Sequence, residues 1–322
     1  MKEGLAVVVQ PCPDANIEVL SYELQSAGGV TTHKGRLCIS SDNGYYSFLS
    51  HELGSQTLHQ VKAKQYFGVI QPHELHAHGD RIWVGNTGFN CIAEVDESSS
   101  FKPYWYPPFI DPNDSIGDRC HLNGFAICPD KERPEYATVF CRSNKRRGWR
   151  EDAIDGGCVY QLSTNAVILD GLIRPHSPKL HQGELFLLES GSGKLIAIDL
   201  QSRESRVVHQ TQGFVRGLYL IEDTAVIGIS AFRETFHNLP NADPTIKAGL
   251  VFINIRTGQE TARLSFEETM SEFFSVTALT SGDGRQSRHR LDMGTGHFVS
   301  IGRDLPRELQ DLLNEQAAGE SV

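Results

Sequence analysis

The chain has 322 residues and a formal net charge of −10, with 30 Lys and Arg against 40 Asp and Glu. Hydrophobic residues make up 39% and charged residues 22%, a composition that excludes wholesale disorder, and the acidic balance argues against a nucleic-acid partner. No segment approaches the roughly 18 apolar residues that span a bilayer, and the apolar run 5–9 is too short for a secretory signal.

Short runs of β-branched and aromatic residues, separated by Gly, Asn, Asp and Ser, fill the chain up to residue 302. Five of these runs end in similar hairpin turns, in the segments 45–55, 91–100, 158–166, 195–204 and 250–260. Their aligned turn residues are 46, 67, 36 and 55 positions apart, at Ser50, Asp96, Ser163, Asp199 and Asn254. A recurrence every ~40–50 residues, with about four strands each, is typical of β-propeller blades.

A second landmark, a turn that leads into an apolar strand, precedes the hairpins in the segments 33–39, 78–84, 181–187 and 222–229. The third blade carries an insertion in 125–140. A sixth blade would take its inner part from 274–284 and 296–302, and the N-terminal strand 5–9 would close the ring, which removes exposed strand edges. The sequence thus predicts an all-β fold, a single β-propeller over residues 1–302, with six blades and with five or seven as alternatives.

The segment 303–322 has a different pattern. Asp304 can cap a helix, Pro306 suits its first turn, and four leucines form one apolar stripe, at positions 305, 309, 312 and 313. We expect a short C-terminal helix packed on the propeller, with a partner-binding helix as the alternative.

The residues that begin each innermost strand should face the central channel at one end. Counting back nine residues from the apolar strand position reaches His73 in the second blade and His176 in the fourth. The same count reaches Gly217, next to Arg216, in the fifth blade. In the third blade the string DRCHLNGF places His121 at the corresponding position. The sequence therefore predicts three histidines and one arginine at the channel mouth.

Such a ring of imidazoles has two chemical uses. Neutral histidines can hold Fe(II), Mn(II) or Zn(II), so His73, His121 and His176 are conditional metal ligands. Without a metal they can transfer protons near neutral pH, while Arg216 stabilises a developing oxyanion. The alternative is a structural role, in which the histidines hold neighbouring blades in register.

Polar segments flank this ring. In the turn GNTGFNCI (85–92), the amides of Asn86 and Asn90 would either meet a substrate or cap the turn. In the loop 108–124, Asp118 and Arg119 would either pair with each other or orient His121. The basic segment 141–152, which surrounds a tryptophan, would either receive an anionic substrate or form a solvated loop.

Other patterns exclude further chemistries. The string SGSGKL (190–195) lacks the spacing of a phosphate-binding loop, and no dinucleotide fingerprint occurs, so no nucleotide cofactor is expected. Seven cysteines without a C-x-x-C pair predict neither a disulfide framework nor a zinc ribbon. We expect buried thiols in a reducing cytoplasm.

The strings GNTGFNCIAEVD, PPFIDPNDSIGDRCHLNGFA, RRGWREDAIDGGCV, GLIRPHSPKLHQGELFLLESGSGKL and GFVRGLYL, in this order, resemble an uncharacterised bacterial family of conserved hypothetical proteins. The resemblance covers roughly residues 70–280 and implies a propeller-like fold without an assigned activity. The family pattern falls on His73, Asn86, Asn90, Cys91, Asp118, Arg119, His121, Asn123, Gly148, Trp149, Arg150, His176, Ser177, Gly213 and Arg216.

The leading hypothesis is an enzyme whose site lies at one end of the propeller axis. It would carry out metal-assisted or acid–base lyase, isomerase or cyclase chemistry on a small molecule or a peptide, an anionic one included. The expected catalytic residues are His73, His121, His176 and Arg216. The expected substrate-binding residues are Asn86, Asn90, Asp118, Arg119, Asn123, Trp149 and Arg150. The alternatives are a non-haem iron oxygenase and a non-catalytic propeller that binds a partner protein.

Overall fold

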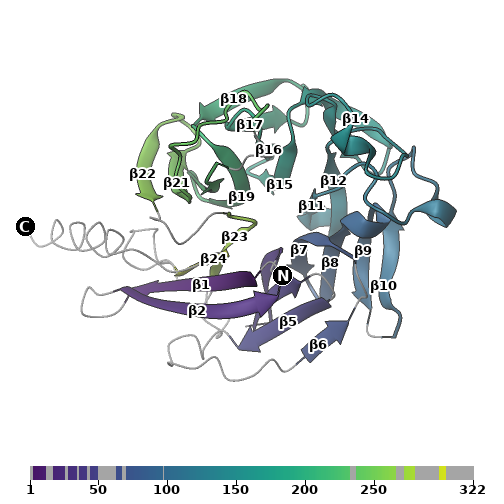
Figure 1. Ribbon diagram of the computed structural model, residues 1–322, viewed down its shortest axis with the longest axis horizontal. Helices are drawn as coiled ribbons and strands as arrows, with labels where there is room; N and C mark the ends of the chain where they lie inside the picture. Colours follow the sequence, from purple (N-terminus) through teal and green to yellow (C-terminus); the bar gives the residue numbers. More distant parts are fainter. Residues whose placement is uncertain are drawn as a thin grey trace, which may run out of the picture.

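The computed structural model describes residues 3–11, 17–25, 28–34, 36–41, 44–49, 63–66, 70–96, 98–232, 237–265, 272–279 and 297–301. These residues are almost entirely β-strand, and Figure 1 shows the strands gathered into sheets around a central axis. No helix among them is long and apolar enough to cross a membrane. The helix predicted for 303–322 lies outside the described residues.

The described strands form six four-stranded antiparallel sheets, which are the blades of a propeller. From the axis outwards, the first sheet contains β3 (Val30–His33), β4 (Arg36–Ser41), β5 (Gly44–Leu49) and β6 (Ala63–Tyr66). The second sheet contains β7 (Pro72–His78), β8 (Arg81–Asn86), β9 (Cys91–Asp96) and β10 (Ser100–Trp105). The third sheet contains β11 (Gly124–Cys128), β12 (Arg133–Val139), β13 (Gly157–Gln161) and β14 (Ala166–Leu172). The fourth sheet contains β15 (Pro175–His181), β16 (Glu184–Glu189), β17 (Lys194–Asp199) and β18 (Ser205–Gln210). The fifth sheet contains β19 (Phe214–Ile221), β20 (Thr224–Ser230), β21 (Gly249–Asn254) and β22 (Glu260–Ser265). The sixth sheet contains β23 (Val276–Leu279), β24 (His297–Ile301), β1 (Glu3–Pro11) and β2 (Ile17–Gln25).

The ring is closed by strands from both ends of the chain. In the sixth sheet β1 pairs antiparallel with β24, from Ala6 opposite Ile301 to Val9 opposite Phe298. The innermost strands β3, β7, β11, β15, β19 and β23 contact one another in this order, and β23 contacts β3 again. The predicted fold class, an all-β propeller closed by the N-terminal strand, is therefore confirmed.

The turns that served as landmarks join the first and second strands of the blades. Gly79 and Gly183 occupy such turns with φ of 57° and 85°, a backbone region that glycine enters without steric cost. In the third blade the predicted insertion is a short 3-10 helix, η4 (Pro129–Lys131), between β11 and β12.

Burial follows the position of a strand within its blade. The second strand β16 is buried along almost its whole length, because adjacent blades cover both faces of the sheet. The outermost strand β22 is mostly exposed. Two large clusters fill the spaces between blades: one joins Trp83 to Phe125, and the other joins Phe186 to Val251. The inner strands are thus fixed by packing on both sides.

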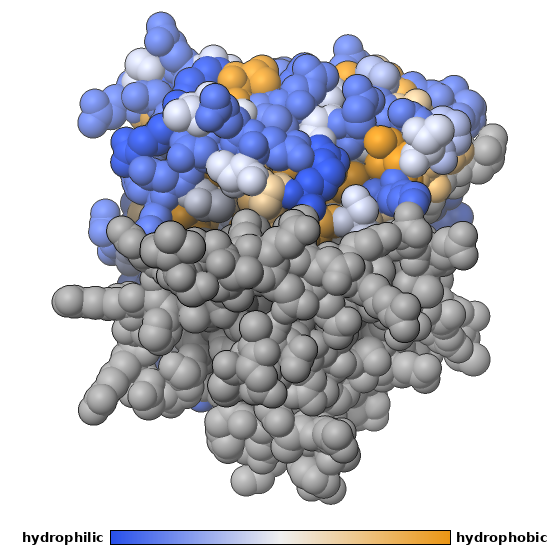
Figure 2. Space-filling view, turned by 90° about the vertical axis from the view of Figure 1, so that its left-hand side faces the viewer, coloured by the Kyte–Doolittle hydropathy of each residue, from blue (hydrophilic) through white to orange (hydrophobic). Residues whose placement is uncertain are grey.

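The described surface carries no large apolar face on the side shown in Figure 2, where apolar residues lie in small groups among hydrophilic ones. Large exposed apolar side chains elsewhere among the described residues come from separate segments, at Tyr104, Ile116, Ile154, Val167 and Val207.

The six described cysteines are all thiols, and all except Cys128 are buried. Burial raises the pKa of Cys91 and of Cys141 to about 12, so these thiols stay protonated and unreactive. They serve as small packing residues between the blades.

Candidate active site

Three histidines from consecutive blades lie together near the start of the innermost strands. His73 and His176 are the second residues of β7 and β15, and His121 lies in the segment just before β11. The ring centroids of His73 and His121 are 4.6 Å apart. The Phe140 ring lies beside both His121 and His176, at centroid distances of 4.4 and 5.0 Å. The imidazoles therefore share one site near the start of the innermost strands.

The position of the proton on His73 follows from its neighbours. Its Nδ1 lies 2.9 Å from Thr87 Oγ1 and 3.4 Å from the carbonyl oxygen of Gln71. The Thr87 hydroxyl donates its one proton to the carbonyl of Leu122 at 2.5 Å. The Thr87 oxygen can then only accept from His73, so neutral His73 carries its proton on Nδ1. Its Nε2 is left with a lone pair.

His176 is held in the same way two blades further on. Its Nδ1 lies 3.0 Å from the Arg174 carbonyl oxygen and 2.7 Å from Ser190 Oγ. A carbonyl can only accept, so Nδ1 is the donor here as well. In both blades the carbonyl stands two residues before the histidine and the hydroxyl fourteen residues after it.

His121 has a carboxylate partner instead. Its Nδ1 donates to Asp118 Oδ2 at 2.9 Å, and the Trp149 indole donates to the same oxygen at 2.7 Å. The Trp149 ring also stacks beside His121, with centroids 4.4 Å apart. An aspartate behind Nδ1 fixes the tautomer and stabilises the imidazolium formed when Nε2 takes a proton. Asp118 therefore orients His121, which is one of the two alternatives that the sequence left open.

The surroundings keep His73 and His176 neutral. Burial, His121 and the Arg216 guanidinium together hold the pKa of His73 well below its ordinary value. Burial and Arg216, followed by the other two imidazoles, do the same for the pKa of His176. At neutral pH both rings are uncharged and present an unprotonated Nε2.

These lowered pKa values predict that acid destabilises the fold. In the unfolded chain a histidine binds its proton near its ordinary pKa of about 6.5, whereas folded His73 and His176 bind it only at lower pH. Below about pH 6.5 the unfolded state therefore binds more protons, and the free energy of unfolding falls by up to about 1.4 kcal/mol per pH unit for each histidine. Above that pH these two histidines do not change the free energy of unfolding.

Urea unfolding between pH 7.5 and 5.5 measures this slope. The double variant His73→Gln/His176→Gln should show a clearly shallower loss of stability than the wild type. The free energy of unfolding of this variant should still fall somewhat with pH, because burial and Lys179 also lower the pKa of His76. An identical slope in both proteins would show that the two imidazoles are not buried in neutral form.

Arg216 on β19 lies beside the histidines and is itself anchored. Its Nη1 donates to Glu272 Oε1 at 2.6 Å, and its guanidinium lies 4.0 Å from the Phe274 ring centroid. Glu272 and Phe274 were not expected from the sequence, although both lie directly before the innermost strand β23. The pair fixes the guanidinium close enough to the imidazoles to lower the pKa of His73 and His176.

Asn90 supports the loop that carries His121. Its Nδ2 donates to the Ser115 carbonyl at 2.7 Å, and its Oδ1 accepts from the backbone N–H of Arg119 at 2.8 Å. Asn90 has none of its surface exposed and holds the loop, and its expected contact with a substrate stays a prediction. The Arg119 side chain pairs with Asp114 at 2.8 Å, so the alternative pairing between Asp118 and Arg119 is not formed.

Two further asparagines expected to bind substrate also have structural contacts. Asn86 accepts a bond from the Phe89 N–H and caps the 3-10 helix η2 (Thr87–Phe89). Asn123 donates to the Pro175 carbonyl at 2.9 Å and accepts from Thr138 Oγ1, which links the third blade to the fourth. Both side chains are buried, so the structure gives them positioning roles.

The basic segment 142–150 lies directly against the histidines. Trp149 binds Asp118, the Arg150 guanidinium lies 4.9 Å from the Trp149 ring centroid, and Arg174 donates to the Trp149 carbonyl. At its outer part, Lys145 pairs with Glu151. The segment thus supplies one wall of the site and places cationic groups at its rim.

A second ionisable cluster lies further along the same inner strands. Lys179 on β15 donates to Glu74 Oε1, and its Nζ lies 2.6 Å from His76 Nε2 on β7. Glu74 Oε2 accepts the backbone N–H of Phe125 on β11 at 3.1 Å. Burial alone would raise the pKa of Glu74, but Lys179 and His76 outweigh it and hold that pKa below its ordinary value. The cluster therefore joins three blades by charge-assisted hydrogen bonds.

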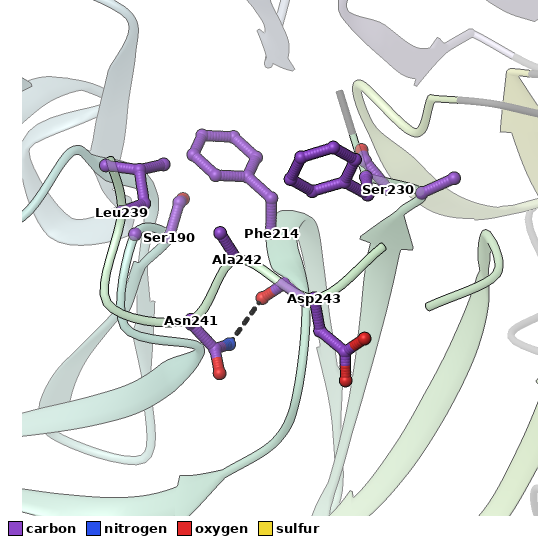
Figure 3. A pocket seen from close by; sticks show the side chains of 11 residues that line it. Ser190, Phe214, Ser230, Leu239, Asn241, Ala242 and Asp243 are labelled. Carbon is purple, nitrogen blue, oxygen red and sulfur yellow. Dashed lines mark hydrogen bonds between the residues drawn. The ribbon is translucent and has the colours of Figure 1, made fainter. Parts of the chain in front are cut away.

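A pocket adjoins the histidines between the fourth and fifth blades (Figure 3). It has room for about one water molecule. Its lining includes Ser190, whose hydroxyl contacts His176, and Phe214, whose ring centroid is 5.6 Å from that of His176. The remaining walls are mixed, with apolar Leu239 and Ala242 beside polar Asn241 and Asp243.

The histidines meet only part of what a metal site requires. Neutral imidazoles with Nδ1–H fixed by carbonyl, hydroxyl or carboxylate groups are suitable donors. Yet among the residues that the structure describes, no three His, Cys, Asp or Glu side chains are gathered so that they could hold an ion. The expected binding of iron, manganese or zinc by His73, His121 and His176 therefore stays a prediction.

Residues 1–284 match a sequence family described as a domain of unknown function, DUF4915. The chain belongs to this family. The match includes the first blade, where the resemblance found in the sequence did not extend. No curated protein is significantly similar to the chain in sequence.

Solved structures share the fold with this member of the DUF4915 family. Regucalcin, a calcium-binding protein from Agrobacterium tumefaciens, superposes with a TM-score of 0.52 at 9% identity, over 88% of this chain and 92% of regucalcin. A chain of the nidogen/laminin complex superposes with a TM-score of 0.50 at 8% identity, over 81% of this chain and 92% of its own length. Both are propeller-like proteins, and at such identities the likeness concerns the fold alone.

Proposed function

We propose that this protein is an enzyme that moves protons next to a carbonyl group, in a lyase, isomerase or cyclase reaction on a small molecule. The observation that carries the proposal is the common orientation of the three imidazoles. Each directs its Nδ1–H to a protein acceptor, which leaves Nε2 as a base. Perturbed histidines gathered at the mouth of a propeller channel are typical of catalytic sites.

His121 is the general base in this proposal, since Asp118 stabilises its protonated form. Its Nε2 takes a proton from the carbon next to the substrate carbonyl, and the electron pair of that bond moves onto the carbonyl oxygen. Arg216 stabilises the resulting enolate through its positive charge. The proton then returns to a neighbouring carbon in an isomerase, or a leaving group departs in a lyase.

His73 and His176 keep the site neutral and dry, and His121 itself returns the proton that its Nε2 took from carbon. The cations at the rim, Arg150 among them, would attract an anionic substrate. No step of the proposal uses a metal ion.

Solvent exchange tests the proposal on any carbonyl compound that the site accepts. The protein is incubated in D₂O with a panel of small ketones, aldehydes and 2-oxo acids, and ¹H NMR follows the C–H signals next to each carbonyl. At least one compound should exchange clearly faster than in buffer, both before and after treatment with a chelator. Exchange that a chelator abolishes, together with near-stoichiometric metal by elemental mass spectrometry, would assign the site to the metal-assisted chemistry instead. No accelerated exchange in any compound would count against the proposed reaction class.

A further inference from the structure

A short arginine-rich segment is fixed to the loop that carries His121. Three exposed arginines form what we call the arginine turn: Arg146, Arg147 and Arg150. The Arg147 N–H donates to the Asp118 carbonyl at 2.8 Å, and the Trp149 N–H donates to the Arg119 carbonyl at 3.2 Å. These backbone bonds hold the arginine turn beside the imidazoles.

The side chains of the arginine turn lie close to the site. The Arg150 guanidinium is 4.9 Å from the Trp149 ring centroid, and the His121 ring is 4.4 Å from the same centroid. Arg146 lies across Gly117, where a Cβ would be only 2.8 Å from its Nε. Because Gly117 belongs to the loop just before His121, both guanidinium-bearing chains contact residues that support the proposed base.

The charge of the arginine turn is not balanced by nearby carboxylates. Within the part of the chain that the structure describes, none of its three guanidiniums forms an ion pair, whereas the two cations just before it do: Arg142 pairs with Asp170, and Lys145 pairs with Glu151. The chain as a whole has a net charge of −10, so a cationic group without partners is unusual on it. Clustered like charges repel one another, and an anion bound between them would relieve this repulsion.

A fourth cation adjoins the arginine turn. Arg174 donates to the Trp149 carbonyl at 3.0 Å, and its guanidinium lies 5.4 Å from the Trp149 ring centroid. It is half-buried and forms no ion pair with a described residue. Burial lowers the pKa of Arg174, and Cys141 and Asp152 offset this effect only in part. Positive charge therefore extends from the arginine turn to the side chains around His121.

From these contacts we infer that the arginine turn binds an anionic group of the substrate, a carboxylate or a phosphate, while the substrate carbonyl lies at His121. A guanidinium offers parallel N–H donors that match both anions. The inference rests on the proposed function and names its substrate class. Trp149 and His121 Nδ1 donate to the same oxygen of Asp118, whereas Nε2 takes the proton. The anionic group must therefore be several bonds away from the reacting carbon.

Two probes that differ in charge but hardly in shape test the inference. 5-Oxohexanoate carries a ketone and a distant carboxylate, and in 5-oxohexanamide a neutral amide replaces the carboxylate. Affinities are measured by NMR titration at low ionic strength, with the Trp149 indole N–H signal, assigned through Trp149→Phe, as the reporter. The wild type should bind 5-oxohexanoate about tenfold more tightly, because hydrogen bonds between charged groups are the stronger ones. Added salt should reduce this ratio, since it screens exposed charges.

Variants assign the preference to the arginine turn. Arg146→Gln/Arg147→Gln/Arg150→Gln should bind the two probes about equally. The control Arg133→Gln/Arg203→Gln/Arg206→Gln removes the same charge from exposed positions near the turns at the opposite end of the blades, and it should keep the preference. Equal affinities in the wild type, no binding of either probe, or a preserved preference in the first variant would overturn the inference.

Competition identifies the anion. Inorganic phosphate and acetate are added at equal ionic strength, and at least one of them should displace 5-oxohexanoate. The stronger competitor shows whether the anionic group is a phosphate or a carboxylate. Displacement by neither would contradict the inference.

Binding and catalysis are measured separately. A preference for 5-oxohexanoate without solvent exchange in any compound would refute the proposed reaction and leave the anion site in place. Solvent exchange of neutral ketones without this preference would refute the anion site alone.

Discussion

Replacing His121 with glutamine should lower the rate of solvent exchange about 10²- to 10⁴-fold, the usual contribution of a general base. Glutamine keeps the approximate size of the side chain and can still bond Asp118, but it cannot take a proton from carbon. The unfolding midpoint in urea should stay close to the wild-type value. The rate is measured by ¹H NMR in D₂O with the best compound of the panel.

The control is His78→Gln, the same substitution at the opposite end of β7, which should leave exchange unchanged. Asp118→Asn separates positioning from catalysis, because it removes the negative charge but preserves the shape. It should slow exchange, since the imidazolium of His121 loses its counter-charge. Wild-type exchange by His121→Gln would show that another group is the base.

Replacing Lys179 with methionine should destabilise the fold by about 3 kcal/mol or more, the cost of leaving a buried charge without its partner. Glu74, with only 8% of its side chain exposed, would lose the cation that offsets the cost of burying its charge. The link between β7, β11 and β15 would also weaken. Equilibrium unfolding in urea measures the change in the free energy of unfolding.

The double variant Glu74→Gln/Lys179→Met should recover most of this loss. A glutamine amide can still accept the Phe125 N–H and donate to His76 Nε2, and no buried charge remains. Lys34→Met removes a similar ion pair with Asp80, but Lys34 and Asp80 are largely exposed, so stability should hardly change. A large loss in the double variant would show that the lysine acts through packing and not through its charge.

The blade pattern was readable from the sequence because it is local. Each hairpin lies within a few residues of its turn, so the spacing of turns such as 79–80 and 182–183 reports the strand pairing directly. The same locality placed His73 and His176 at the start of their strands. The pairing of β1 with β24 joins the chain ends, and the need to close the ring was enough to predict it.

The residues that form hydrogen bonds with the histidines are marked in the sequence by a weaker local pattern. Thr87 and Ser190 both follow directly on the second strand of their blades and both precede a glycine, fourteen residues after a histidine. That repeat is visible in the sequence and could have identified both partners. For Asp118 the sequence left two options open, and only the fold of its loop, held by Asn90, decides between them.

The contacts between distant segments were beyond sequence reasoning. Lys179 and Glu74 are 105 residues apart, and Arg216 and Glu272 are 56 residues apart. Which inner strands face each other is fixed by blade order and by the bulges in β7, β15 and β19. A bulge shifts which side chains face the channel, and turn spacing does not reveal it.

The most direct test of the site is the protonation of its three imidazoles. Long-range ¹H–¹⁵N NMR at pH 7 distinguishes Nδ1–H, Nε2–H and doubly protonated histidine, and substitution of one histidine at a time assigns the signals. All three rings should carry hydrogen on Nδ1, and His73 and His176 should carry none on Nε2, both at pH 7 and at pH 6. An Nε2–H tautomer of His121 would contradict the account, because its Nε2 would then have no lone pair to act as a base. Doubly protonated His73 or His176 at pH 7 would contradict the lowered pKa values of these two rings.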